Sequence, residues 1–416
     1  MSAEVISIGA LGAMFVVATV LPMNIGILAF IGAFVVGTSS LGLSEDQIFE
    51  GFPVSLFVTI VGVTYLFSVA QRNGTIDLLV RAGVGLVRGK VALVPWVLFG
   101  VAAVLTAFGT FAPAAVALLV PIGMNFAYRY GINQLMIGMM VISGAHAGSF
   151  SPIAVSGALV LGMVDSTPLD VAPYALFLAS FAFNLLLSAL TFLALRRRAP
   201  EAAADPSALT SDARGEPAIT WRQGLTLLAL AGLVVGALGF HLEIGFLALA
   251  AGAALALVDM RNQSKAVEGI SWSTILLVAG MVTYVGILEK AGTIESISRG
   301  AAGMGAPLFV ALLLCLVVAV VSAFASSTAI LTTIIPIAVP LLLASHLSAA
   351  GFVAALAIST TIVDTSPFST NGALVLSNAR GVDRDRFYKQ IIGYTAGIIG
   401  AGPLLAWSFL VVPGAL

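Results

Sequence analysis

Charge is scarce in this sequence. Asp, Glu, Lys and Arg make up 9% of its 416 residues, whereas hydrophobic residues make up 60%. A soluble globular domain carries about a quarter charged residues, so this composition excludes the ordinary soluble class and indicates a protein of the lipid bilayer. The formal net charge is −1, and the positive residues form no basic face that could neutralise phosphates. Nucleic acid is therefore excluded as a partner.

Cysteine is almost absent, and so is a basic N-terminal cluster. The one cysteine, Cys315, lies in an apolar run, which excludes an intrachain disulfide, an iron–sulfur cluster and a zinc finger. We expect no cofactor and no redox chemistry. No basic residue precedes the first apolar run, and a second run follows it directly. A cleaved signal peptide is therefore not expected.

Long apolar runs are what the sequence has in abundance. Each half of the chain contains runs near or above the ~17 residues that a membrane crossing needs. The runs are Val5–Leu21, Asn24–Leu41, Val54–Val69, Val91–Phe108, Ala112–Tyr128, Leu135–Met163, Val171–Leu195, Gly224–Phe240, Ile244–Val258, Ser273–Leu288, Pro307–Ala325, Ala329–Leu347, Val353–Leu376 and Ile391–Val412. The pattern predicts an all-α polytopic membrane protein.

A polar segment rich in Ala, Pro and charge separates the two halves. We predict a first repeat at 1–195, a linker at 196–221 and a second repeat at 222–416. The paired runs that flank Gly109–Thr110 and Ser326–Ser327 are interpreted as hairpins that return to their own side of the membrane. Two full spans remain open in each case, and the parity of crossings is the same either way.

The Lys and Arg residues indicate the orientation. With the N-terminus outside, only Lys290 and Arg299 of the 18 positive residues fall in outer loops. Cytoplasmic loops carry an excess of Lys and Arg in membrane proteins. We therefore predict a multi-pass protein of the bacterial inner membrane with a periplasmic N-terminus and a cytoplasmic linker.

Short motifs recur between the halves at nearly constant offsets. The matching pairs include Glu50-Gly51 with Glu268-Gly269, and Ser151-Pro152 with Ser366-Pro367. Each half has five predicted crossings, an odd number, so the second half enters the membrane inverted. Inverted repeats are typical of secondary transporters, whose substrate sites lie near the midplane. A duplicated structural membrane protein is the alternative.

Polar, helix-breaking clusters interrupt two spans at matched positions, 143–152 and 359–371. Such clusters are tolerated in mid-membrane where they line a cavity. We predict that Pro152 and Pro367 each open a restarting helix, with the serine before each proline as its N-cap. No Lys or Arg lies deep in any span, so the two helix starts would bind an anion through N–H groups and dipoles. The alternative is that these hydroxyls bond carbonyls within kinked helices.

Small polar residues also interrupt the two hairpins. They are Thr110 in the first hairpin, and Ser326, Ser327 and Thr328 in the second. We expect these residues to complete the site.

Asp364 is the one acidic residue deep inside a predicted span. Burying a charge there is costly unless it serves a cation, a proton or a partner. We predict that Asp364 binds a coupling cation, with hydroxyls of Thr365 and Ser326 completing the shell. Sodium is favoured and a proton is the alternative. His146 is the nearest ionisable counterpart, and we expect it to be a neutral histidine bonded to a backbone carbonyl.

At these residues the chain resembles the malonate and dicarboxylate carriers of the ion-transporter superfamily, relatives of the divalent anion/sodium symporters. The resemblance rests on the run Asp364-Thr-Ser-Pro-Phe-Ser-Thr-Asn-Gly-Ala-Leu-Val and on Gly148-Ser-Phe-Ser-Pro in the first half. It implies an elevator mechanism, in which hairpins and broken helices slide against a scaffold that is usually dimeric. The substrate would be a small di- or tricarboxylate anion of the malonate, succinate, malate or citrate class.

The resemblance also implies which residues hold the substrate. In the symporters each hairpin tip carries Ser-Asn-Thr, whereas this sequence has Ser326-Ser327-Thr328 in the second tip and Gly109-Thr110-Phe111 in the first. The substrate contacts carried over from the family are Ser149, Ser151, Thr365, Ser366, Ser369, Thr370 and Asn371.

Two functions of other classes compete with carboxylate transport. An intramembrane hydrolase would use His146 near Ser149 and Ser151, but no third group to orient the histidine can be identified and no HExxH motif is present. We therefore predict that the chain is not an enzyme. A cation/proton antiporter that uses Asp364 is the second alternative, and its transport would need no organic anion.

Overall fold

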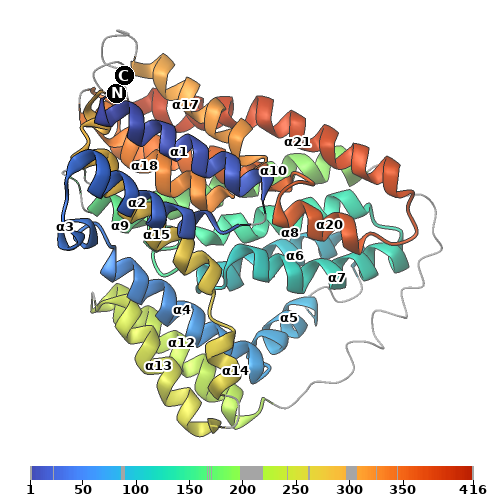
Figure 1. The fold of residues 1–416 in the computed structure, drawn as a ribbon. Helices are drawn as coiled ribbons and strands as arrows, with labels where there is room; N and C mark the ends of the chain where they lie inside the picture. Colours follow the sequence, from blue (N-terminus) through green and yellow to red (C-terminus); the bar gives the residue numbers. More distant parts are fainter. Residues whose placement is uncertain are drawn as a thin grey trace.

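The computed structural model describes residues 2–21, 23–85, 90–165, 167, 169, 171–196, 219–240, 242–260, 263–296, 307–324, 326–343 and 345–414. Within these residues the chain forms helices and no strand (Figure 1). Most of the predicted linker, residues 197–218, lies outside the described part of the chain, as do Arg299 and Ala325.

The described residues of the first half form ten α-helices, and most of them match the predicted apolar runs. The helices are α1 (Ala3–Val20), α2 (Ile25–Leu41), α3 (Glu45–Phe49), α4 (Val54–Arg72), α5 (Thr75–Gly85), α6 (Val94–Ala107), α7 (Ala112–Tyr130), α8 (Gln134–Ser149), α9 (Val155–Asp165) and α10 (Pro173–Leu195), with the short 3₁₀-helix η1 (Val91–Leu93) before α6.

The described residues of the second half repeat much of this order. They form α12 (Trp221–Gly239), α13 (Ile244–Val258), α14 (Gln263–Glu268), α15 (Trp272–Lys290), α17 (Pro307–Ser322), α18 (Ser327–Leu343), α19 (Ala349–Thr361), η4 (Ile362–Thr365), α20 (Thr370–Asn378), α21 (Arg384–Ala406), η5 (Trp407–Val411) and η6 (Val412–Gly414). Five segments among the described residues are long and apolar enough to cross a membrane: α4, α10, α15, Ala349–Asn378 and Arg384–Gly414.

Three short helices, α3, α5 and α14, lie outside the apolar runs and were not predicted. In α3 the Ser44 hydroxyl accepts from the N–H of Gln47, and the Gln47 side chain accepts from the N–H of Ser44. This reciprocal capping satisfies two of the donors that a helix start leaves free. A capped helix of five residues is too short to show an apolar period.

Both predicted helix breaks are present, but each helix restarts later than predicted. The backbone N–H of Ala154 donates to Ser151 O at 2.9 Å, and that of Ser369 donates to Ser366 O at 3.0 Å. Each Ser-Pro pair therefore opens a β-turn, a position that suits proline, and the helix begins only after the turn, at Val155 and at Thr370. The prediction of Ser151 and Ser366 as N-caps is wrong. Ser369 caps α20, since its hydroxyl accepts from Gly372 N.

Glycines allow two pairs of helices to cross in close contact. A Cβ on Gly26 of α2 would lie 2.0 Å from Leu276 O of α15, and a Cβ on Gly280 of α15 would lie 2.0 Å from Gly26 O. The other crossing joins α4 to α13, where a Cβ on Gly62 would lie 2.3 Å from Gly245 O. Side chains larger than hydrogen would separate the backbones at both crossings.

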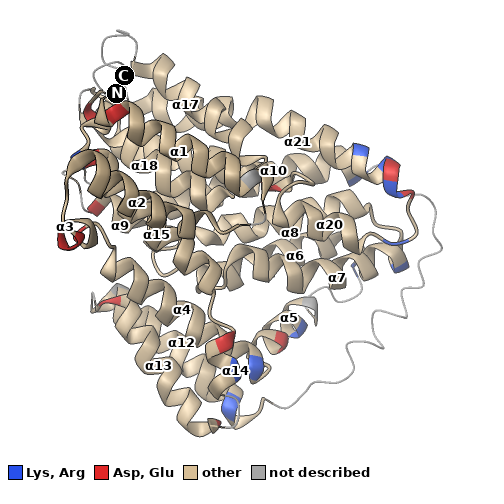
Figure 2. Cartoon of the chain, viewed as in Figure 1, with Lys and Arg blue, Asp and Glu red and all other residues tan. Residues whose placement is uncertain are grey.

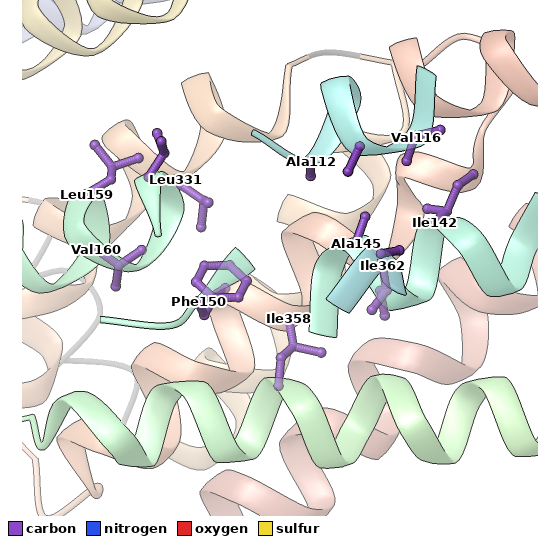
Figure 3. Packing of buried hydrophobic residues seen from close by; sticks show 14 of the residues in the cluster. Ala112, Val116, Ile142, Ala145, Phe150, Leu159, Val160, Leu331, Ile358 and Ile362 are labelled. Carbon is purple, nitrogen blue, oxygen red and sulfur yellow. The ribbon is translucent and has the colours of Figure 1, made fainter. Parts of the chain in front are cut away.

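The broken helices of each half pack against the hairpin of the other half. Helix α9 packs on α18, and α20 packs on α7. Figure 3 shows one part of this shared core, in which Leu159 of α9 lies beside Leu331 of α18 and Phe150 lies between the two groups of side chains. Apolar residues from both halves therefore form one continuous core around the breaks.

Charged residues lie at the edges of the helix bundle. Figure 2 shows Lys and Arg near the start of α21, at the end of α7 and around α5 and α14, while the acidic residues of α3 lie at the opposite edge. The middle of the bundle carries almost no charge. This distribution suits a multi-pass membrane protein with apolar sides.

Candidate functional site

One cavity brings the polar interruptions of both halves together. Its empty volume is about 1500 Å³. Most of its polar lining comes from Asn24, His146, Ser149, Ser156, Ser273, Thr274, Ser326, Ser327, Thr328, Thr361, Asp364, Ser369, Thr370 and Asn371.

The first turns of six helices reach this cavity: α2, α7, α9, α15, α18 and α20. The unpaired N–H groups at a helix start carry the positive end of the helix dipole. Among the described lining residues there is no Lys or Arg, as predicted, and the only charged or titratable side chains are Asp364 and His146. The field of the cavity therefore favours an anion without any fixed cationic side chain.

Asp364 lies at the cavity wall, where its side chain contacts residues of both halves of the chain. It lies in η4, directly after α19. The hydroxyl of Ser327, in the first turn of α18, donates to Asp364 Oδ1. On its other side, Asp364 Oδ2 lies 3.4 Å from Nε2 of His146 on α8. This carboxylate thus links the second hairpin to the first broken helix.

His146 is buried, with 2% of its surface exposed. Its Nε2 lies 3.4 Å from Asp364 Oδ2 and 3.4 Å from Nδ2 of Asn371. The expectation of a histidine ring bonded to a backbone carbonyl is therefore wrong for Nε2. It is the backbone oxygen of His146 that accepts bonds, from Ser149 Oγ at 3.0 Å and Ser180 Oγ at 3.1 Å.

Asn371 has a buried oxygen with no partner. The residue is 1% exposed, lies in the first turn of α20 and lines the cavity. Its Oδ1 makes no hydrogen bond within the described part of the chain. Because buried polar atoms are nearly always bonded, this amide is placed to meet a ligand or its water.

Seven of the predicted substrate residues line the cavity and four do not. Those that line it are Ser149, Ser326, Ser327, Thr328, Ser369, Thr370 and Asn371, whereas Ser151, Thr365, Ser366 and Thr110 do not. The Ser366 hydroxyl accepts from Phe368 N at 3.2 Å within its own turn.

Thr365 also points away from the predicted cation site. Its hydroxyl lies 3.2 Å from Thr395 Oγ1 on α21. Of the three predicted cation ligands, Asp364 and Ser326 therefore share the cavity, while Thr365 lies behind the wall.

The first hairpin tip lies in a separate, smaller cavity with an empty volume of about 490 Å³. Gly109 adopts a φ of +116°, which only glycine takes readily, and Thr110 follows it. The Thr110 hydroxyl is buried without a partner among the described residues. Gly109 and Thr110 thus face only the smaller cavity, whereas Phe111 lines both, and the first turn of α7 reaches the larger one through Ala112 and Pro113.

The large cavity contains polar residues that were not predicted: Asn24, Ser156, Ser273 and Thr274. Asn24 caps α2, since its Oδ1 accepts from Gly26 N at 2.8 Å. Its Nδ2 donates to Ser273 O at 2.8 Å and to Ser273 Oγ at 3.0 Å. Asn24 therefore ties the start of α2 to the start of α15.

Comparisons with known proteins support the identification of the chain as a transporter. Residues 1–149 match the family model described as the N-terminus of the dicarboxylate carrier protein MatC, which confirms the resemblance over that part of the chain. A search of curated proteins finds no significant match.

Among solved structures, the chain is similar to the Alcanivorax borkumensis YdaH transporter, whose crystal structure is said to reveal an unusual topology. The TM-score is 0.61 at 18% identity, over 90% of this chain and 88% of that one. This level of identity shows a shared fold. Both matched proteins are transporters and not enzymes.

Proposed function

We propose that the chain is a secondary active transporter of small dicarboxylate anions. One observation carries the proposal: six helix starts reach a single cavity that has no lysine or arginine in its described lining. Such a cavity can hold an anion through backbone N–H groups and hydroxyls, and release it again because no ion pair has to be broken. The match of residues 1–149 to a dicarboxylate carrier family supports the choice of anion.

The two halves are proposed to be inverted-topology repeats. The glycine crossing of α2 with α15 has its counterpart in that of α13 with α4. Likewise, a Cβ on Gly157 would lie 2.0 Å from Ser151 O, and one on Gly372 would lie 2.0 Å from Ser366 O. Packing contacts of this kind that recur at matched positions support a duplicated and inverted plan.

Transport is proposed to follow an elevator mechanism in the inner membrane. The hairpins and broken helices α6 to α9 and α17 to α20 would move with the anion against a scaffold that contains α4, α12 and α13, which form a separate group in Figure 1. The charge distribution of Figure 2 fits a cytoplasmic edge at α5, α14 and the start of α21. A homodimer through the scaffold is part of the same proposal.

A coupling cation is proposed to bind at Asp364. Its carboxylate shares the cavity with the hydroxyls of Ser326 and Ser327. Sodium prefers oxygen ligands, and a cation between Asp364 and a dianion would remove their mutual repulsion. A proton is the alternative coupling ion.

Proteoliposomes containing the purified full chain test the proposal. Vesicles loaded with unlabelled malonate should exchange it for external labelled malonate, and an inward sodium gradient should drive net uptake. Succinate, malate and citrate should each compete, and chloride should not. Absence of exchange with all four carboxylates would contradict the proposed function.

A cation/proton antiporter is the second candidate, because the partly buried Asp364 lies beside His146 in the cavity. That function predicts proton movement driven by a sodium gradient with no organic anion present. A pH-sensitive dye inside the same vesicles separates the two functions. A dye response without carboxylate would favour the antiporter.

A further inference from the structure

One wall of the large cavity consists of the starts of α2 and α15, which belong to neither a hairpin nor a broken helix. The backbones touch where Gly26 of α2 meets Leu276 and Gly280 of α15, and the Asn24 side chain bonds Ser273 at the start of α15. Ala329, in the first turn of α18, belongs to the same buried cluster as Ile25 and Ala29 of α2. This wall therefore lies next to the second hairpin.

Two features make the wall suitable for a carboxylate. The hydroxyl of Ser273 accepts from Asn24 Nδ2 and keeps its own proton to donate at the start of α15. Thr274 is 9% exposed and lines the cavity, and its hydroxyl has no hydrogen-bond partner within the described part of the chain. This hydroxyl is not enclosed by protein but open to the cavity, where a ligand atom or its water would form a hydrogen bond with it.

The crossing of α13 with α4 shows that such a helix start can bind a carboxylate. Glu243 caps α13, which crosses α4 as α2 crosses α15. The Glu243 carboxylate accepts from Phe246 N at 2.8 Å and from the Thr59 hydroxyl at 3.1 Å. There the protein supplies its own carboxylate to a helix start and a hydroxyl of the crossing helix. At the α2–α15 crossing the cap is the neutral Asn24, and no protein carboxylate fills the equivalent place among the described residues.

We propose that the α2–α15 crossing is a second carboxylate subsite, in which Asn24 positions the donors Ser273 and Thr274. The inference rests on the proposed function. One carboxylate of the substrate binds at the starts of α18 and α20 near Asn371, and the other binds at this crossing. A substrate with two carboxylates binds at both subsites, whereas a monocarboxylate leaves the subsite at the α2–α15 crossing empty. The subsite is therefore what selects dicarboxylates over monocarboxylates.

The first test measures this selectivity by binding of malonate, succinate, acetate and propionate to the purified full chain. Thr274→Val keeps the side-chain shape and removes the hydroxyl. It should weaken malonate and succinate binding about tenfold while acetate and propionate change by less than twofold, so that the selectivity falls. Thr283→Val on the same helix is the matched control, because the Thr283 hydroxyl bonds to Ala279 O within α15. The control should leave selectivity at the wild-type value.

A second variant places a charge at the subsite without removing the cap. Aspartate caps a helix as well as asparagine does, so Asn24→Asp should fold. It would imitate Glu243 at the other crossing and should weaken malonate and succinate binding by more than a hundredfold, and acetate binding far less. Folding is checked by size exclusion and by the melting temperature without ligand.

The outcomes separate the two levels of the proposal. If the wild type binds dicarboxylates but Thr274→Val and Asn24→Asp keep its selectivity, the subsite is overturned and the proposed function stands. If none of malonate, succinate, malate and citrate binds the wild type, the proposed function is overturned, and the subsite with it. A parallel loss of mono- and dicarboxylate binding in Thr274→Val would also overturn the subsite, because it indicates general damage to the cavity.

Discussion

Asn371 and Ser366 belong to the same broken helix but face different surroundings. The Asn371 amide lines the cavity with a free oxygen, whereas the Ser366 hydroxyl is bonded within its own turn. We expect Asn371→Ala to weaken malonate binding about tenfold or more, since a hydrogen bond to a charged group contributes about 1.5–3 kcal/mol. Ser366→Ala should change binding less than twofold. Isothermal titration of both variants checks the pair, and equal losses would contradict the assignment of Asn371 to the site.

Asp364 is proposed to couple cation binding to transport. Asp364→Asn keeps the shape and removes the charge, so sodium-driven accumulation of malonate should be lost. The measurement is uptake into proteoliposomes under a sodium gradient at fixed pH, then under a pH gradient without sodium. An asparagine variant that responds to both gradients as the wild type does would exclude Asp364 from coupling.

Sequence patterns indicated the important residues of the second broken helix, but not which of their side chains point into the cavity. The 3₁₀-helix η4 follows α19 with three residues per turn in place of 3.6. This change of period turns Thr365 toward Thr395 and leaves Asp364 at the cavity. Asn24, Ser273 and Thr274 were missed because each reads as an ordinary polar residue at the start of an apolar run. Only the contact between α2 and α15 brings them together.

At the scale of helices, the glycine crossings make a sharp prediction. A Cβ at position 280 would meet a backbone oxygen at 2.0 Å, and backbone cannot move aside as a flexible side chain can. Gly280→Ala should therefore destabilise the protein by about 1–3 kcal/mol. Melting in detergent, followed by size exclusion, measures the loss.

Gly393→Ala on α21 is the control for this substitution. Nothing lies within 4 Å of a Cβ at that position, and alanine favours a helix by up to about 1 kcal/mol over glycine. The control should melt at the same temperature or higher. If Gly280→Ala melts at the same temperature as Gly393→Ala, the close crossing of α2 and α15 is wrong.

Long elements could be predicted from the sequence, and short ones could not. Runs such as Ile244–Val258 appear at the same residues in the structure, because a buried or lipid-facing helix must be apolar over most of its length. The breaks were also predictable from proline and polar residues in apolar surroundings. Their restart points were not, since a β-turn after Ser-Pro and a helix starting at the proline have the same composition.

At the scale of the molecule, apolar composition and repeated motifs were enough to predict a multi-pass helical transporter. The placement of Gly109 and Thr110 in the smaller cavity, while the second tip lines the larger one, was not predictable, because the tips match in sequence position. Their difference in the folded chain depends on how the halves pack. An elevator transporter in one of its end states would have this asymmetry, with one tip at the open cavity.

Orientation and motion can be tested with single cysteines. Cys315 is the only cysteine and is fully buried, so Cys315→Ala provides a cysteine-free background. In that background Ile219→Cys, within the predicted linker, should react with a membrane-impermeant maleimide only from the cytoplasmic side. Periplasmic labelling at this position would overturn the predicted topology.

Thr328→Cys in the same background reports on the second hairpin, since Thr328 lines the large cavity. If α18 moves with the anion, malonate with sodium should shift the equilibrium between end states and change the rate of labelling severalfold. A ligand can shift this equilibrium only through its different affinity for the two states, so acetate, which fills one subsite, should have a smaller effect than malonate. Ile219→Cys lies outside the cavity and should label at one rate with or without substrate. If saturating malonate leaves the labelling rate of Thr328→Cys unchanged, the second hairpin does not move with the bound anion.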